Sequence, residues 1–168
     1  DITASTGRAA LLIGGTTLHS WAAIGLGRDP VVKLVEKIRK DRYARQRWRK
    51  AQLLVIDEIS MISAALLDVL DTIARHIRNQ DRPFGGLQVL GSGDFLQLPP
   101  VKAEYCFNAA CFDKLFAEDA RVVLDHNYRQ KADPVFQRIL KRIRSDALRA
   151  EDNAALRARV GVDAPAGL

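Results

Sequence analysis

Short apolar runs alternate along this chain with longer stretches in which apolar residues recur at helical spacing. The runs occupy residues 53–56 (LLVI), 87–90 (LQVL) and 121–124 (RVVL). Runs of this length and composition are typical of strands that are buried on both faces of a parallel sheet. Residues 1–5 have the character of the end of a further strand. The pattern therefore predicts a sheet built from several buried strands.

Helical spacing is clearest after Ser63, a residue type that caps helix N-termini. The apolar stripe that follows it is Leu66, Leu67, Leu70, Ile73, Ala74 and Ile77. Asp133 and Pro134 predict a second helix, because aspartate is a good N-cap and proline suits the first helical position. We expect the apolar side chains of that helix to face inward, namely Val135, Phe136, Ile139, Leu140 and Ile143.

Shorter helices are expected near the start of the chain. Residues 8–13 end at two glycines that suit a left-handed cap, and residues 18–24 follow Thr17, a suitable N-cap. Residues 28–50 are helical in composition but have poor periodicity. Strands that alternate with helices predict an α/β fold, a three-layer sandwich around a mostly parallel sheet.

The net charge of +6 comes from one segment. Residues 33–50 hold nine basic and two acidic residues, so their balance is 9 − 2 = +7 and the rest of the chain sums to −1. Such a patch is the electrostatic footprint of a polyanionic partner such as nucleic acid, although a solvated helix face has the same composition. Tyr43 and Trp48 could stack on bases or could anchor the segment to the core.

The remaining composition is that of a single globular domain of 168 residues. No stretch approaches the roughly 20 apolar residues of a membrane span, and no secretory signal is visible. Cys106 and Cys111 are too few to form a metal cage or a disulfide framework. We therefore expect an intracellular protein.

The strongest chemical feature is the pair Asp57-Glu58, which directly follows the apolar run 53–56. In an open α/β sheet, ligands bind at the carboxyl ends of the strands. A carboxylate fixed there suits Mg²⁺, so Asp57 is the candidate metal ligand. Glu58 is the candidate base for the water that attacks a γ-phosphate. A capped strand end is the alternative interpretation.

Two further side chains suit a nucleotide site. Gln97 follows the run 87–90 in a polar loop, where its amide could orient water beside the γ-phosphate. Arg129 follows the run 121–124 and could bind a phosphate through two hydrogen bonds, or could form a surface ion pair. The chain has no Gly-x-x-x-x-Gly-Lys-Ser/Thr phosphate loop.

Hydroxyl-bearing residues form two clusters that are bracketed by glycines. The clusters comprise Thr3, Ser5, Thr6, Thr16, Thr17 and Ser20, with His19 inside the second. Hydroxyls and backbone N–H groups at helix starts commonly contact nucleic-acid phosphates. Ordinary helix capping is the alternative for the hydroxyls, and a structural role is the alternative for His19.

Taken in order, these segments resemble the Pif-type (petite integration frequency) family of superfamily-one DNA helicases over residues 1–160. Residues 3–7 with 9–10 are similar to motif Ia of that family, 14–19 to motif Ic, 55–61 to motif II, 93–100 to motif III, and 128–130 with 133, 134 and 136 to motif IV. Residues 67–88 resemble the signature insert of the family, although Val69 and Asp71 replace its usual Lys and Glu.

The resemblance implies a RecA-like P-loop NTPase domain and an ATP-driven motor with Mg²⁺ as cofactor. Such a motor moves 5′ to 3′ on single-stranded DNA and unwinds duplex, forked and G-quadruplex DNA. By motif, Asp57 would hold Mg²⁺, Glu58 would be the catalytic base, Gln97 the γ-phosphate sensor and Arg129 the arginine finger. The residues that would line the DNA path are Thr3, Ser5, Thr6, Thr17 and His19.

The resemblance also sets the expected domain organisation. Residues 1–160 would be part of a first RecA-like domain, truncated before its phosphate-loop strand and helix, with 28–50 as a basic insert that corresponds to a wedge subdomain and 161–168 as a loose tail. The parent protein would be a monomer with a second RecA-like domain, in the nucleus or mitochondrion of a eukaryote or the cytoplasm of a bacterium. The present chain alone would be inactive as an ATPase.

Three other functions are consistent with parts of the sequence. A non-catalytic single-stranded DNA-binding module derived from a helicase would bind DNA without turning over nucleotide. A RecD-like or relaxase-linked helicase would lack the turn at residues 83–86. A P-loop ATPase with no nucleic-acid partner would leave the basic segment unexplained.

Overall fold

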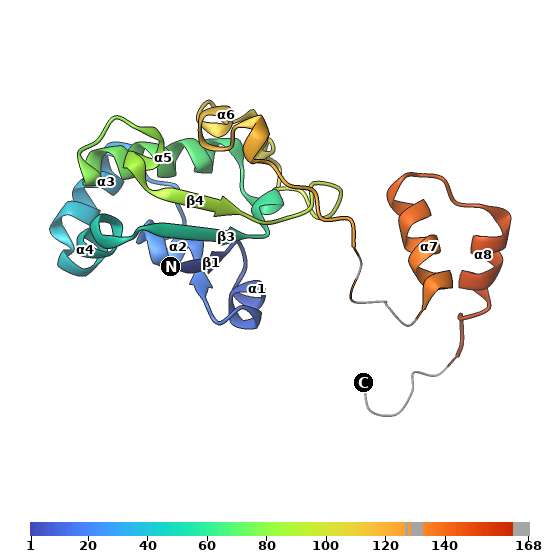
Figure 1. Cartoon of the computed structure of the whole chain (residues 1–168). Helices are drawn as coiled ribbons and strands as arrows, with labels where there is room; N and C mark the ends of the chain where they lie inside the picture. Colours follow the sequence, from blue (N-terminus) through green and yellow to red (C-terminus); the bar gives the residue numbers. More distant parts are fainter. Residues whose placement is uncertain (127, 129–132, 163–168) are drawn as a thin grey trace. The chain divides into compact units, whose positions relative to one another are not determined.

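A computed structural model describes residues 1–126, 128 and 133–162 of the chain. The chain divides into two compact units, residues 1–121 and 122–168, and each unit is considered by itself. The first unit contains the sheet and the second contains two helices (Figure 1). No helix in these described ranges is long and apolar enough to cross a bilayer.

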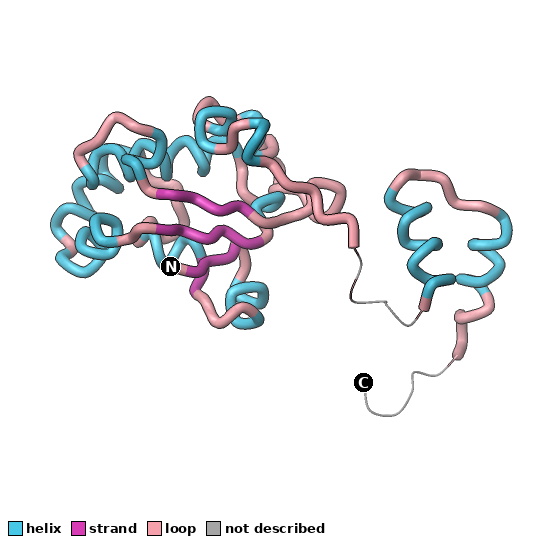
Figure 2. Tube along the Cα trace, in the orientation of Figure 1, coloured by secondary structure: helices cyan, strands magenta, loops and turns pink. Residues whose placement is uncertain are grey.

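The first unit is built on a four-stranded parallel sheet in the order β2-β1-β3-β4 (Figure 2). Its strands are β1 (Ile2–Ala4), β2 (Thr16–Thr17), β3 (Leu53–Asp57) and β4 (Gln88–Gly91). Crossovers that contain helices join β1 to β3 and β3 to β4, as parallel pairing requires. The sheet confirms the predicted α/β class with a mostly parallel sheet.

Three helices of the first unit begin within one residue of the predicted positions, namely α1 (Gly7–Leu12), α2 (Leu18–Ala22) and α5 (Ala64–Arg78). The basic segment forms α3 (Val31–Lys40) and α4 (Arg42–Lys50), and α6 (Phe112–Leu115) was not predicted. Four short 3-10 turns complete it, namely η1 (Ile59–Met61), η2 (Pro83–Gly86), η3 (Cys106–Asn108) and η4 (Glu118–Ala120). The side chain of Ser63 caps α5 and that of Thr17 caps α2, as their residue types predict.

The basic segment is more regular than its sequence indicates. It forms two amphipathic helices, α3 and α4, which meet at Asp41, the C-cap of the first and the N-cap of the second. The poor periodicity of residues 28–50 as a whole arises because the turn at Asp41 resets the phase of the apolar stripe. Trp48 of α4 is fully buried against Trp21, and its indole N–H donates to the carbonyl of Ala22. One face of the segment therefore belongs to the core.

Two strand expectations need correction. Residues 121–124 form no strand within the described part of the chain, and Val123 is 90% exposed. An apolar run becomes a strand only where a neighbouring strand accepts its hydrogen bonds, and none of the four described strands pairs with it. The run 87–90 does form β4, but Leu90 is 55% exposed, on the same face of the sheet as Ile2 and Leu53, which are 48% and 37% exposed.

The second unit pairs α7 (Pro134–Arg144) with α8 (Ala150–Arg157). Asp133 caps α7 and Pro134 occupies its first position, as predicted. Arg142 bonds to Asp152 and Glu151, and these hydrogen bonds from the guanidinium hold the pKa of Asp152 below its usual value. The inward-facing stripe is narrower than expected: of its five apolar residues, Ile139 alone is buried in this unit.

A buried carboxylate and an arginine fasten η2 to α5. Asp71 accepts hydrogen bonds from the backbone N–H of Phe84 at 2.6 Å and from Nε of Arg75 at 2.7 Å. Arg78 donates to the carbonyl of Gly85 at 2.8 Å and also to carbonyls at the end of α4, those of Trp48 and Ala51. These hydrogen bonds therefore hold the predicted turn at 83–86 against α5 and connect α5 to the end of α4.

Position 85 requires glycine for two reasons. Its φ is +57°, and a Cβ there would lie 2.6 Å from the carbonyl oxygen of Ala74. We expect Gly85→Ala to lower the free energy of unfolding by about 3 kcal/mol, from left-handed strain and overpacking together. Gly14→Ala is the matched control, since Gly14 has φ +64° but open space around it, and should cost roughly 1 kcal/mol. Urea unfolding of both variants measures the difference, and equal losses would contradict the steric contribution.

Candidate functional site

The predicted site residues lie at the carboxyl edge of the sheet, where the register of the strands brings them together. Ala4 of β1 is opposite both Thr17 of β2 and Asp57 of β3. Because the strands are parallel, the residues that follow them emerge at the same edge. Ser5 is tied there directly, since its backbone N–H donates to the carbonyl of Asp57 at 3.1 Å. The motifs that are separated by about fifty residues in sequence thus meet at one edge.

Asp57 and Glu58 are both available for chemistry. Asp57 ends β3 and is half-buried, and Glu58 follows it as the first residue of a tight turn into η1. Neither carboxylate has a hydrogen-bond or ion-pair partner among the described residues. Glu58 adopts φ +53° and ψ +45°, a left-handed conformation that is rare for a residue with a long side chain. Such strained residues concentrate at functional sites.

The loop after β4 packs against this turn. The N–H of Ile59 donates to the carbonyl of Ser92, and the N–H of Ser92 donates to that of Ile56, both at 2.9 Å. A Cβ on Gly93 would lie 3.0 Å from the backbone nitrogen of Ile59. Glycine at position 93 therefore allows the two loops to pack backbone to backbone. This packing fixes the position of the loop that carries Gln97 relative to Glu58.

Gln97 is held by Asp94 in the same loop. Its side-chain Nε2 donates to Oδ2 of Asp94 at 2.9 Å, and its backbone N–H donates to the Asp94 carbonyl. Oδ1 of Asp94 accepts the backbone N–H of Leu96, which gives the loop an Asx turn. Gln97 is otherwise exposed, so its amide is accessible to a ligand. Sequence reasoning missed Asp94, although aspartate after glycine is a common turn signal.

The hydroxyl clusters divide into different environments. Thr3 is fully buried and its hydroxyl donates to the carbonyl of Val55 at 2.6 Å, so this side chain braces β1 against β3 and does not face solvent. The prediction of a DNA contact through the Thr3 side chain therefore does not fit its burial. Thr6 and Thr17 accept backbone N–H groups as the caps of α1 and α2. The capping interpretation thus holds for both, and each remains partly exposed.

His19 lies in the first turn of α2, two residues after Thr17. It is half-buried, and this burial lowers its pKa below the ordinary value for histidine. At neutral pH the ring is therefore uncharged and can act as one donor and one acceptor. It can contact a ligand through a hydrogen bond but contributes no charge to the site.

Two serine hydroxyls at this edge are buried without a partner among the described residues, Oγ of Ser5 and Oγ of Ser60. Ser5 follows β1, and Ser60 lies in the η1 turn two residues after Glu58. Buried polar atoms are normally hydrogen-bonded, so orphans beside a carboxylate pair mark a position where a further polar group fits. Ser60 has no sequence signal beyond its place after Asp57-Glu58, and sequence reasoning did not single it out.

Some site predictions lie beyond this geometry. Arg129 is outside the described residues, and so is much of the 161–168 tail. Within the described ranges, no group of three or more His, Cys, Asp or Glu side chains could enclose a metal ion. Asp57 with one neighbouring carboxylate still fits Mg²⁺, because that ion is commonly held by one or two carboxylates together with water and phosphate oxygens.

Comparison with known proteins identifies relatives of this chain. Residues 2–149 match the family model of PIF1-like helicases. The ATP-dependent DNA helicase PIF1 of Emericella nidulans is 48% identical over 149 residues, which cover 85% of this chain and 20% of that protein. The ATP-dependent DNA helicase PIF1 of Homo sapiens is 41% identical over 170 residues, covering 96% of this chain and 26% of that protein.

Solved structures show the same fold. The Pif1 helicase of Candida albicans superposes with a TM-score of 0.91 at 38% identity, covering 99% of this chain and 39% of that one. The Pif1 helicase from Bacteroides in complex with ADP-AlF3 and single-stranded DNA gives a TM-score of 0.81 at 29% identity, covering 99% and 41%.

The chain spans about a fifth to a quarter of the length of the curated relatives named above. The family match nevertheless extends over most of its residues and includes the segments that build the carboxyl edge, from the hydroxyl clusters to Gln97. The expected resemblance and the expected RecA-like fold are both confirmed. This chain belongs to the PIF1-like helicase family.

Proposed function

We propose that the protein carrying this chain is an ATP-dependent DNA helicase that moves 5′ to 3′ along single-stranded DNA and unwinds duplex, forked and G-quadruplex DNA. The observation that carries the proposal is the Asp57-Glu58 pair at the carboxyl edge of the sheet, whose carboxylates have no partner among the described residues, in a chain of this family. Relatives named as ATP-dependent DNA helicases support it, as does the Bacteroides complex with ADP-AlF3 and single-stranded DNA.

Within this proposal the carboxyl edge is the acidic half of an ATP site. Asp57 would hold Mg²⁺, and the ion would supply neutralisation of the negative charge on the phosphates. Glu58 accepts a proton from the attacking water, and its strained backbone fixes where the carboxylate can reach. Gln97, steadied by Asp94, directs its amide at the γ-phosphate or the water. Arg129 stabilises the negative charge of the transition state.

The DNA path in this proposal runs past the ends of β1 and β2. Thr6, Thr17 and His19 offer hydroxyls and an uncharged imidazole, which suit sugar-phosphate contacts that are independent of sequence, and Ser5 lies at the same edge with its hydroxyl buried. Thr3 supports the path indirectly by bracing β1 against β3. A second RecA-like domain of the parent protein would complete both the ATP site and the DNA groove.

Residues 1–168 lack a phosphate loop, so we propose that this polypeptide by itself does not hydrolyse ATP. The remaining proposals follow from the family. The parent is a monomer, and it acts inside the cell, in the nucleus or mitochondrion of a eukaryote or the cytoplasm of a bacterium. A non-catalytic single-stranded DNA-binding module is the second candidate function. The many basic residues of α4 favour that candidate for the isolated chain, because DNA binding to them needs no nucleotide.

Replacement of the proposed base tests the motor function. In the full-length protein that carries this chain, Glu58→Gln should lower single-stranded DNA-stimulated ATPase activity by about 10²- to 10⁴-fold, because the amide cannot accept the proton. DNA affinity should be retained. Glu36→Gln, an equal change at an exposed position on α3, is the control and should leave the rate unchanged. Full activity in Glu58→Gln would remove Glu58 from the mechanism.

The Asp94–Gln97 contact makes a separate prediction. Gln97→Ala should reduce ATPase turnover by about a hundredfold, the typical cost of losing one well-placed polar group in a transition state. Asp94→Asn keeps a hydrogen-bond acceptor in the turn and should therefore have a smaller effect. Steady-state kcat, measured with saturating DNA and ATP, separates the two variants. Equal losses would show that Asp94 itself contributes to the site.

A further inference from the structure

The exposed face of α4 presents cations at successive helical turns. Arg42, Arg45 and Arg49 lie at intervals of three and four residues, so they share one side of the helix, and Lys50 follows. Together with Gln46 they line a depression of about 280 Å³. Arg42 and Arg49 are about 10 Å apart along the helix axis, since each residue rises 1.5 Å. The face therefore extends over the length of several phosphate groups.

No described carboxylate neutralises these cations. No basic side chain of α3 or α4 forms an ion pair in the part of the chain that the structure describes. Arg45 instead donates to the carbonyl of Arg39 at 2.8 Å, and Arg49 donates to the carbonyl of Ile77 at 3.0 Å. Backbone carbonyls fix the guanidinium groups in place but carry no full negative charge. The positive potential of the face is thus directed at solvent.

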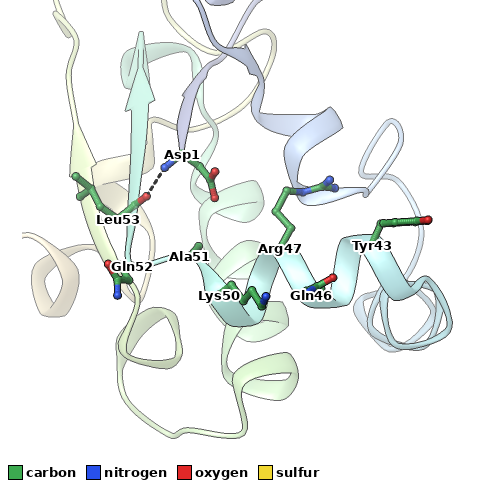
Figure 3. Close-up of a pocket in the computed structure, with 8 residues that line it drawn as sticks. All are labelled: Asp1, Tyr43, Gln46, Arg47, Lys50, Ala51, Gln52 and Leu53. Atoms are coloured by element: carbon green, nitrogen blue, oxygen red, sulfur yellow. Dashed lines mark hydrogen bonds between the residues drawn. The ribbon is translucent and has the colours of Figure 1, made fainter.

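An aromatic ring lies beside the cations. Tyr43 is 79% exposed, although it sits on a helix whose other aromatic residue, Trp48, is fully buried. Tyr43, Gln46, Arg47 and Lys50 line one side of an open pocket of about 620 Å³, with Asp1, Gln52 and Leu53 on the other side (Figure 3). Gln46 and Lys50 belong to both depressions, which makes the two hollows one continuous surface.

This surface lies at the opposite end of the sheet from the candidate ATP site. The pocket includes Leu53, where β3 begins, whereas Asp57 ends the same strand. Four residues of extended chain separate the two positions by about 13 Å. A ligand on the α4 face therefore contacts different residues from one that binds Ser5, Thr17 or Glu58.

We propose that the α4 face is a second binding surface for single-stranded DNA, distinct from the path at the carboxyl edge. Phosphates bind Arg42, Arg45, Arg49 and Lys50, and an unpaired base stacks on Tyr43. Uncompensated cations match a polyanion, and an exposed ring beside them matches a strand whose bases are unpaired. The choice of DNA as the polyanion rests on the proposed function, and the surface itself rests on the charge and geometry of α4.

Removal of two charges tests the binding of phosphates. Arg42 and Lys50 are exposed and have no hydrogen-bond partner among the described residues, so Arg42→Gln with Lys50→Gln should leave the fold intact. We measure the affinity of the 168-residue chain for a fluorescent oligothymidylate by anisotropy at several salt concentrations. The slope of log affinity against log salt should become shallower by about 1.4, or about 0.7 for each phosphate that is no longer neutralised.

The matched control is Lys114→Gln with Arg159→Gln, which removes the same net charge from exposed positions outside α4. If both double variants shift the slope equally, the effect is one of overall charge and the proposed surface is wrong. If neither shifts it, the oligonucleotide binds elsewhere, which also overturns the proposal. Circular dichroism of each variant checks that the helices are retained.

Tyr43 gives an independent test of stacking. Tyr43→Ala should weaken oligothymidylate binding by about tenfold without changing the salt slope, and Tyr43→Phe should restore the affinity because it keeps the ring. Equal binding by Tyr43→Ala and the unchanged chain would overturn the stacking step. A duplex of the same length that binds as tightly as the oligothymidylate, and loses as much with Tyr43→Ala, would overturn the assignment to a single strand.

These measurements need no ATP and change no residue of the carboxyl edge, so their failure is distinguishable from failure of the motor function. A chain that binds through α4, within a full-length protein that shows no DNA-stimulated ATPase activity, would support this surface and contradict the motor. The reverse pair of results would leave the motor and remove this surface.

Discussion

The central position of β3 determines the arrangement of everything else in the first unit. It hydrogen-bonds in parallel to β1 on one side and to β4 on the other, so the loops that leave all three strands emerge at one edge. The strand pairing therefore brings together Asp57, Ser5 and the loop that carries Gln97. Helix α5 follows the same strand and, through Asp71 and Arg78, secures the η2 turn that leads into β4.

Patterns that depend on a few neighbouring residues were predicted well from the sequence. The caps at Thr17, Ser63 and Asp133 and the apolar run before Asp57 all correspond to observed elements. Expectations that depend on distant partners were less accurate: the run at 121–124 pairs with no described strand, and Leu90 is exposed at a sheet edge. Burial of the Thr3 hydroxyl could not be inferred either, because its acceptor lies 52 residues away.

The basic helices illustrate how one segment serves two requirements. Trp48 and the apolar face of α3 secure the segment to the core, while the opposite face carries the positive charge of the chain. Asp41 joins the two helices with a single shared residue, so their charged faces have a fixed relation. The two alternatives posed by the sequence, core anchoring and polyanion binding, are therefore compatible, because different sides of the same helices supply them.

The left-handed conformation of Glu58 has a consequence for how this domain can change over time. A glycine would occupy that backbone with less strain, by about 1 kcal/mol, so folding alone favours the loss of the carboxylate. In a copy of the gene that is not selected for catalysis, replacement of Glu58 by glycine would therefore stabilise the fold and remove the carboxylate. The stability of the fold therefore does not account for a glutamate in this conformation.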